Sequence, residues 1–274
     1  MESIQELLRK LCKCIVKSDD GLNYITISKQ ETPTPPTPPT PPAPAKPDLD
    51  TFDPNVPFCI ENVGDVKASI EYITKNNNIR ISRDYTTWID YKNDDPITLY
   101  PAERLYIKSD YVKDTGSSPR FIFKGDGARL RARGNIASLI YGTGDAYVNK
   151  YTSTEEYCYY RMFFSCISLT QAPDLPATIL ASDCYNTMFY NCTSLTQAPE
   201  LPATTLVTRC YDSMFQNCRK LNYVKCLATD ISASNCTNIW LLDVSAKGDF
   251  YTPASTNWTT GENGIPRGWT RHNV

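Results

Sequence analysis

Cysteine is the residue type in this chain whose number and spacing could do chemistry. The 274 residues include eleven cysteines. Four of them recur at intervals of 26 residues: Cys158, Cys184, Cys210 and Cys236. A series of this kind has three interpretations, namely a disulfide framework, a metal site, or a column of buried thiols in a stacked structure. A zinc site needs close cysteine pairs together with histidines, and the only close pair is Cys12 and Cys14.

Disulfides are the second alternative. Stacked chain segments bring Cα atoms to about 4.8 Å, which a disulfide can span. However, eleven is an odd number, and the first twenty residues do not form an export signal because charged residues interrupt any apolar run. We therefore favour buried free thiols, with some disulfides and a metal site as the alternatives.

Histidine, the usual partner in acid–base and metal chemistry, occurs once, as His272. The sequence accordingly predicts a protein that is not an enzyme and that uses no cofactor and no metal. The net charge of −2 argues against a nucleic-acid partner. No apolar run reaches the ~20 residues that span a bilayer, so we expect no membrane segment.

Internal repeats must position the cysteines. Residues 158–183 and 184–209 agree at sixteen of 26 positions, and residues 210–235 are a divergent third copy. Within each copy Cys, Met and Cys lie at i, i+4 and i+8, which is typical of one face of a short helix. The following "SLTQAPELP" is typical of a brief strand and turn. One strand and one helix per 26 residues predicts a leucine-rich-repeat-like solenoid. Its predicted core consists of Cys158, Met162, Cys166, Cys184, Met188, Cys192, Cys210, Met214 and Cys218.

Positions that differ between the copies indicate a candidate binding face, because outward-facing residues are freer to vary. They are Tyr160, Arg161, Phe164, Asn186, Thr187, Tyr190, Asp212, Ser213 and Gln216. The alternative is that these positions vary because they meet only water. After the last divergent unit, Trp258 and Trp269 are expected to cover the open end of the stack.

The N-terminal segment, residues 1–31, predicts an amphipathic helix that serves as an anchor or in oligomerisation. Its apolar stripe consists of Ile4, Leu7, Leu8, Leu11 and Ile15. A helix of about four turns must dock on something, either the rest of this chain or a partner. With Cys14 the stripe also forms two a/d heptads, which predicts a dimer or trimer.

A proline-rich linker, residues 32–53, follows. Nine prolines in residues 32–47 predict extended polyproline II that acts as a semi-rigid stalk. The P-x-x-P spacing also matches ligands of aromatic-groove domains, which is the alternative. Residues 54–150 then contain short β-branched and aromatic runs separated by turn residues, which predicts a β-sandwich-like domain.

Arg129, Arg131 and Arg133 alternate along one of these predicted strands and so face one way. They are either a small patch for a polyanion or a solvated strand face, and we favour the solvated face. The predicted fold class is thus multidomain α/β plus all-β. Its four parts are 1–31, 32–53, 54–150 and a solenoid with C-terminal cap at 151–274.

The repeat motif, as in "CYNTMFYNCTSLTQAPELPATTL", resembles the BspA-like leucine-rich repeats of surface proteins from gut and oral bacteria and of phages that infect Bacteroidales. The opening "FCIENVGD" and the ending "NWTTGENGIPRGWT" resemble the same phage proteins, over about 220 residues. The layout of residues 1–47 is similar to that of head-fibre proteins of crAss-like phages.

The resemblance implies a non-enzymatic virion protein, a head fibre or capsid decoration subunit assembled in the host bacterial cytoplasm. Its expected partners are a capsid or other virion protein through residues 1–31, further copies of itself, and a host-surface polysaccharide. The alternatives are a bacterial BspA-like surface adhesin, which would need to cross a membrane, and a tail-associated phage fibre.

Overall fold

A computed structural model describes residues 46–74, 78–92, 95–109, 119–141, 152 and 154–274. All of these belong to one compact unit. The predicted N-terminal helix, its anchor residues Ile4, Leu7, Leu8, Leu11 and Ile15, and the proline-rich run up to residue 45 lie outside the described residues.

Residues 46–141, here called the β module, form two facing sheets. Its strands are β1 (Phe58–Asn62), β2 (Ala68–Ile73), β3 (Ile79–Ser82), β4 (Ile89–Asp90), β5 (Ile97–Leu99), β6 (Arg104–Ser109), β7 (Arg120–Lys124) and β8 (Leu130–Arg133). A short helix, α2 (Ser138–Tyr141), follows. One sheet has the order β4-β3-β6-β1-β8-β9 and the other β5-β2-β7. Within the module all neighbouring strands are antiparallel.

Alternating side chains place the core of the module between the two sheets. In β2 the residues alternate between buried and partly exposed, as expected for a strand with one face on a core. Phe121 of β7 stacks on Tyr72 of β2 with 4.6 Å between ring centroids, and it lies 5.2 Å from Phe58 of β1. These rings join the two sheets.

The repeat region, residues 154–245, consists of stacked turns. In each 26-residue unit three backbone residues, spaced four apart, adopt the left-handed conformation. They are Tyr157, Arg161 and Ser165; Asp183, Thr187 and Asn191; Arg209, Ser213 and Asn217; and Asn235, Ile239 and Asp243. Alternate N–H groups bond within the turn, as from Cys166 to the Phe163 carbonyl (3.1 Å). The others donate to the next unit, as from Phe163 to the Met188 carbonyl (2.9 Å).

The predicted fold class, multidomain α/β plus all-β with a leucine-rich-repeat-like solenoid, is therefore wrong. The structure is nearly all β, with 29% strand, 2% helix and no helix of seven or more residues among those described. The i, i+4, i+8 pattern fits a chain of four-residue turns as well as it fits one face of a helix. A left-handed residue at every fourth position ends any helix, and half of the N–H groups leave the unit instead of bonding within it.

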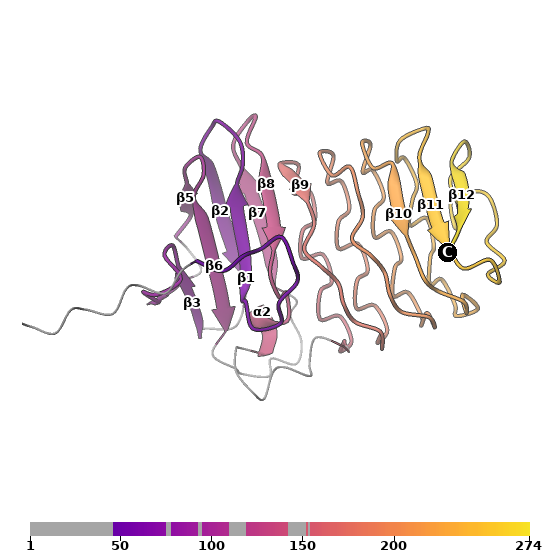
Figure 1. Cartoon of the computed structure of the whole chain (residues 1–274), viewed down its shortest axis with the longest axis horizontal. Helices are drawn as coiled ribbons and strands as arrows, with labels where there is room; N and C mark the ends of the chain where they lie inside the picture. The colour runs from indigo at the N-terminus through magenta and orange to yellow at the C-terminus, as the bar shows by residue number, and fades with distance from the viewer. Residues whose placement is uncertain (1–45, 75–77, 93–94, 110–118, 142–151, 153) are drawn as a thin grey trace, which may run out of the picture. The chain divides into compact units, whose positions relative to one another are not determined.

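Short parallel strands and bridges occupy the opposite side of the repeats (Figure 1). They include β9 (Leu169–Gln171), β10 (Tyr223–Lys225), β11 (Asp249–Thr252) and β12 (Thr270–Asn273). Strands β10, β11 and β12 form a parallel sheet, and β9 pairs in parallel with β8 of the module. On this side no backbone hydrogen bond joins residues 167–182 to residues 193–207, both fully described. The first two units are thus joined through their turns only.

Two aromatic ladders run through the repeats. Phe121 of the module, Phe163, Phe189 and Phe215 stack with centroid distances of 5.3, 5.4 and 5.5 Å. The module therefore provides the first rung of the repeat core. A second ladder consists of Tyr159, Tyr185, Tyr211, Trp240 and Trp258. Trp258 covers its end, and the indole N–H of Trp269 donates to the Ser245 carbonyl (2.7 Å).

Candidate functional site

The nine predicted core residues of the repeats are all buried. The second cysteine of each unit donates its thiol to a phenylalanine carbonyl of the preceding rung. Cys166 bonds the carbonyl of Phe121 (3.4 Å), and Cys192 bonds that of Phe163 (3.1 Å). Cys218 bonds the Phe189 carbonyl in the same way (3.0 Å). These thiols act as packing groups with one hydrogen bond each.

Burial also sets the chemistry of the thiols. It raises the pKa of Cys184 and of Cys218 from the ordinary 9.0 to about 12, and it raises the pKa of Cys192 well above 9.0. The nine cysteines that the structure describes are free. In the described part of the chain no group of three or more His, Cys, Asp or Glu side chains is placed to hold a metal ion. The thiols are therefore protonated at neutral pH, in the form that neither attacks nor binds metal.

The candidate binding face lies on the turn side, where successive units place residues 26 apart next to each other. Its first part is aromatic and cationic. Phe164 stacks on Tyr190 with a centroid distance of 4.8 Å. The guanidinium of Arg161 lies 5.1 Å from the Tyr160 ring and 5.2 Å from the Phe164 ring. That of Arg120 lies 5.5 Å from Phe164.

Its second part is polar and largely self-satisfied. The amide of Asn186 donates to Asp183 (2.8 Å), and that of Asn238 donates to Asp212 (3.2 Å). Ser213, also predicted to face outward, is 8% exposed. The remaining members, Thr187 and Gln216, are half-buried. The structure thus brings the nine predicted residues onto one side, with open aromatic and cationic groups concentrated in the first unit.

The three alternating arginines of β8 have different roles. Arg133 donates to the Leu49 carbonyl (2.6 Å) and pairs with Asp50 (3.0 Å). Arg104 of β6 likewise bonds the Pro47 carbonyl (3.3 Å). Together they hold the segment that follows the proline-rich run against the module. Arg129 and Arg131 do not take part in this.

Arg129 and Arg131 instead line a groove of about 700 Å³, here called the repeat groove. Its other walls come from the first two units, at the side where no backbone bonds join them, and include Gln171 and Gln197. Lys220 of the third unit also contributes. The sequence analysis missed this groove. The signal was the "TQAP" that recurs in both units, which marks two equivalent surface positions.

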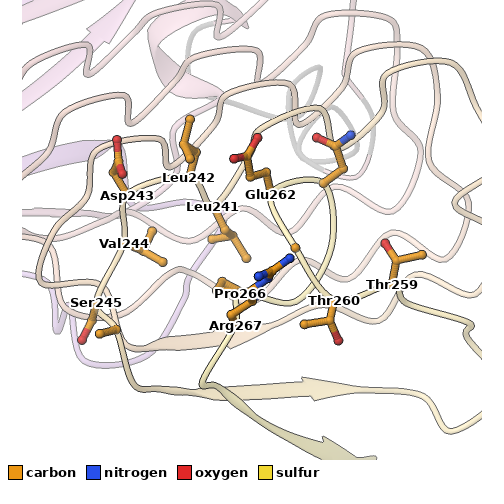
Figure 2. A pocket seen from close by; sticks show the side chains of 13 residues that line it. Leu241, Leu242, Asp243, Val244, Ser245, Thr259, Thr260, Glu262, Pro266 and Arg267 are labelled. Atoms are coloured by element: carbon orange, nitrogen blue, oxygen red, sulfur yellow. The ribbon is translucent and has the colours of Figure 1, made fainter.

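A second groove of about 820 Å³ lies at the end of the repeats (Figure 2). Figure 2 shows its walls, which are the last turn at residues 241–245 and the loop at 259–267. This loop caps the stack. The Asn263 side-chain oxygen accepts from the Ile239 N–H (2.7 Å), and the Gly264 carbonyl accepts from the Trp240 indole (3.0 Å). In the earlier units the next repeat supplies the acceptor for the residue equivalent to Ile239.

Comparisons with known proteins provide no relative for this chain. No family model, no curated protein and no solved structure matches it. In the described ranges no helix is both long enough and apolar enough to cross a bilayer.

Proposed function

We propose that this chain is a non-enzymatic structural protein of a phage virion, a capsid-attached head fibre or decoration subunit. Residues 1–31 attach it to the capsid or another virion protein and gather two or three copies. The proline-rich run then spaces the remainder outward for contact with a host surface.

One observation supports this proposal above the others. The described unit is a stack with a cap at each end, the β module at one and the Asn263 loop at the other. Its core consists of closely stacked rings and protonated thiols. A body of this kind needs no catalytic groups and presents one edge of variable side chains, which is what a display protein requires.

The way the chain enters the module is consistent with a stalk. Leu49 is buried at 8% exposure, and Arg104 and Arg133 bind the carbonyls of Pro47 and Leu49. Directly after the proline-rich run the backbone is therefore held at defined points, so that a semi-rigid spacer would transmit its direction to the module.

The location can be tested with antibodies raised against the full chain. In a lysate of the host that carries this sequence, gold-labelled antibodies should mark the capsids of intact particles. Labelling of tails would support the tail-fibre alternative, and labelling of the cell envelope would support a BspA-like adhesin. Absence of label from every particle would overturn the virion proposal.

The assembly role of residues 1–31 requires a separate measurement. Light scattering should show a dimer or trimer for the full chain and a monomer for a chain that begins at Asp48. If both are monomers, the N-terminal segment does not join copies of this chain. If both are oligomers of equal order, the described unit itself holds the copies together.

A further inference from the structure

We propose that the repeat groove binds an anionic polysaccharide, whose acid groups meet Arg129, Arg131 and Lys220. This inference rests on the proposed surface-contact function and assigns the ligand class and its location, away from the varied turn-side face. The argument uses charge, hydrogen-bonding groups and the shape of the groove in turn.

The first observation is that the cations of the groove are unpaired. Among the described residues, Arg129, Arg131 and Lys220 form no ion pair. Arg131 lies directly across from Glu61 in the β1–β8 register. The Glu61 carboxylate, however, is bound by Arg104, with 3.2 Å between Nε and Oε1.

Arg131 is also half-buried. A partly desolvated guanidinium without a counter-charge is costly, and a bound carboxylate or sulfate would offset that cost with charge-assisted hydrogen bonds. The neighbouring Arg133, by contrast, has both its charge and its donors satisfied within the chain. The sequence places these two arginines in the same pattern, and the structure separates them.

Acidic residues on the groove walls do not cancel these cations. Glu200 is already paired with Lys225, with 2.8 Å between the charged atoms. Asp174 is the other acid, and burial raises the pKa of its carboxyl. The three cations therefore leave the groove with an excess of positive charge.

The hydrogen-bonding groups repeat along the groove. Gln171 and Gln197 occupy equivalent positions of the first two units, and both are exposed. Thr170 and Thr196 precede them in the same arrangement. Amides and hydroxyls can donate to and accept from sugar hydroxyls. Equivalent groups on successive units suit a polymer with a repeating residue.

The backbone of the groove favours a saccharide over a peptide strand. An added strand needs a run of free N–H groups on a sheet edge. Pro173 and Pro199 follow the two glutamines and have no N–H to donate. Recognition in this groove must therefore depend on side chains.

Titration calorimetry on the full chain tests the proposal. The probe is an oligogalacturonate, with a neutral oligodextran of equal length as its uncharged counterpart. We expect binding of the oligogalacturonate only, weakened by salt. The variant Arg129→Gln/Arg131→Gln should bind at least tenfold more weakly, since each lost charge-assisted pair accounts for about one factor of ten. Arg131→Lys should retain part of the affinity.

Arg219→Gln is the matched control, because Arg219 is exposed, adjacent to Lys220 and absent from the groove walls. It should bind like the wild type, and all variants should have the wild-type circular dichroism spectrum. An equal loss in the control would mean diffuse charge attraction and would overturn the site. Tighter binding of poly-glutamate would point to an acidic peptide and overturn the saccharide. Absence of oligogalacturonate binding would overturn the inference, while capsid labelling would still support the proposed function.

Discussion

The β module and the repeat region bury their residues in one common core and yet specify it in different ways. In the module every buried residue meets different neighbours, brought together by antiparallel pairing such as that of Phe58 with Ile107. In the repeats a buried residue meets copies of itself, as Phe189 lies between Phe163 and Phe215. A column of this kind accepts one side-chain size, which is why cysteine, methionine and phenylalanine recur there.

This difference teaches that the two regions should fail for different reasons. The module depends on side-chain alternation over two sheets, whereas the repeats depend on thiols, rings and left-handed turns in register. Eight of the nine described cysteines lie in the repeats, and the module contains only Cys59. Four changes would break or sharpen the comparison.

Alkaline pH should have the largest effect, and it should act on the repeats. Burial raises the pKa of Cys184, Cys218 and Cys226 from 9.0 to about 12. The stability from these thiols is complete below pH 9 and is lost as pH rises from 9 toward 12, because the unfolded chain ionises first. Each pH unit in this window removes about 1.4 kcal/mol per fully buried thiol.

Eight thiols acting together would exceed an ordinary total stability of about 5–15 kcal/mol within two pH units. Amide hydrogen exchange followed by mass spectrometry should therefore show the repeats opening near pH 10 to 11 before the module does. If the module opens first, the thiol columns do not decide base stability.

Phe189→Ala should come next, with a loss of about 3–5 kcal/mol in the free energy of unfolding. The ring is fully buried in the middle of its ladder, so truncation leaves a cavity between two rungs. Urea unfolding followed by tryptophan fluorescence measures the loss. Ile179→Ala, at 66% exposure, is the control and should change stability by less than about 0.5 kcal/mol.

Asn263→Ala tests the cap. The Ile239 N–H loses its acceptor, and we expect a loss of about 0.5–1.5 kcal/mol in the free energy of unfolding. Hydrogen exchange should speed up in the last turn only, at residues 236–243. Asn257→Ala changes an exposed asparagine of the same C-terminal region and should have no such effect. Equal exchange in both variants would mean that the loop does not cap the stack.

Thr187→Asn should have the smallest effect, a gain of about 0.5–1 kcal/mol in the free energy of unfolding. Thr187 has φ = 53°, where a β-branched residue is strained and asparagine is tolerated. Asn235→Thr, at φ = 54°, should lose a similar amount. In a helix the two residue types have nearly equal propensity, so unchanged thermal unfolding in both variants would return the repeats to a helical model.

Sequence patterns predicted the module better than the repeats. The alternation in "PFCIEN", "KASIEYIT" and "PRFIFKG" predicted strands, and the structure has β1, β2 and β7 there. A period of two has only one common structural explanation. A period of four has two, because the spacing from Cys184 to Met188 to Cys192 suits a helix face and a series of four-residue turns alike.

Left-handed positions were the signal that could have separated these alternatives. Asp183, Asn191, Asn217 and Asn235 are of the types that tolerate this conformation, at spacings of eight or of 26. Arg161 and Ile239 adopt it too, and nothing in their chemistry announces it. The repeat groove was beyond prediction, because it depends on which strands fail to pair between two units of nearly identical sequence.

The cap at Asn263 makes chain length a variable that selection can adjust separately from the fold. Every unit offers the next the same set of N–H groups, and the terminal loop satisfies the last set with a side chain. An in-frame duplication of residues 184–209 would thus insert one layer, about 4.8 Å thick, and leave both ends unchanged. Recombination between near-identical repeats could then alter the reach of the protein in single steps, without a new core to evolve.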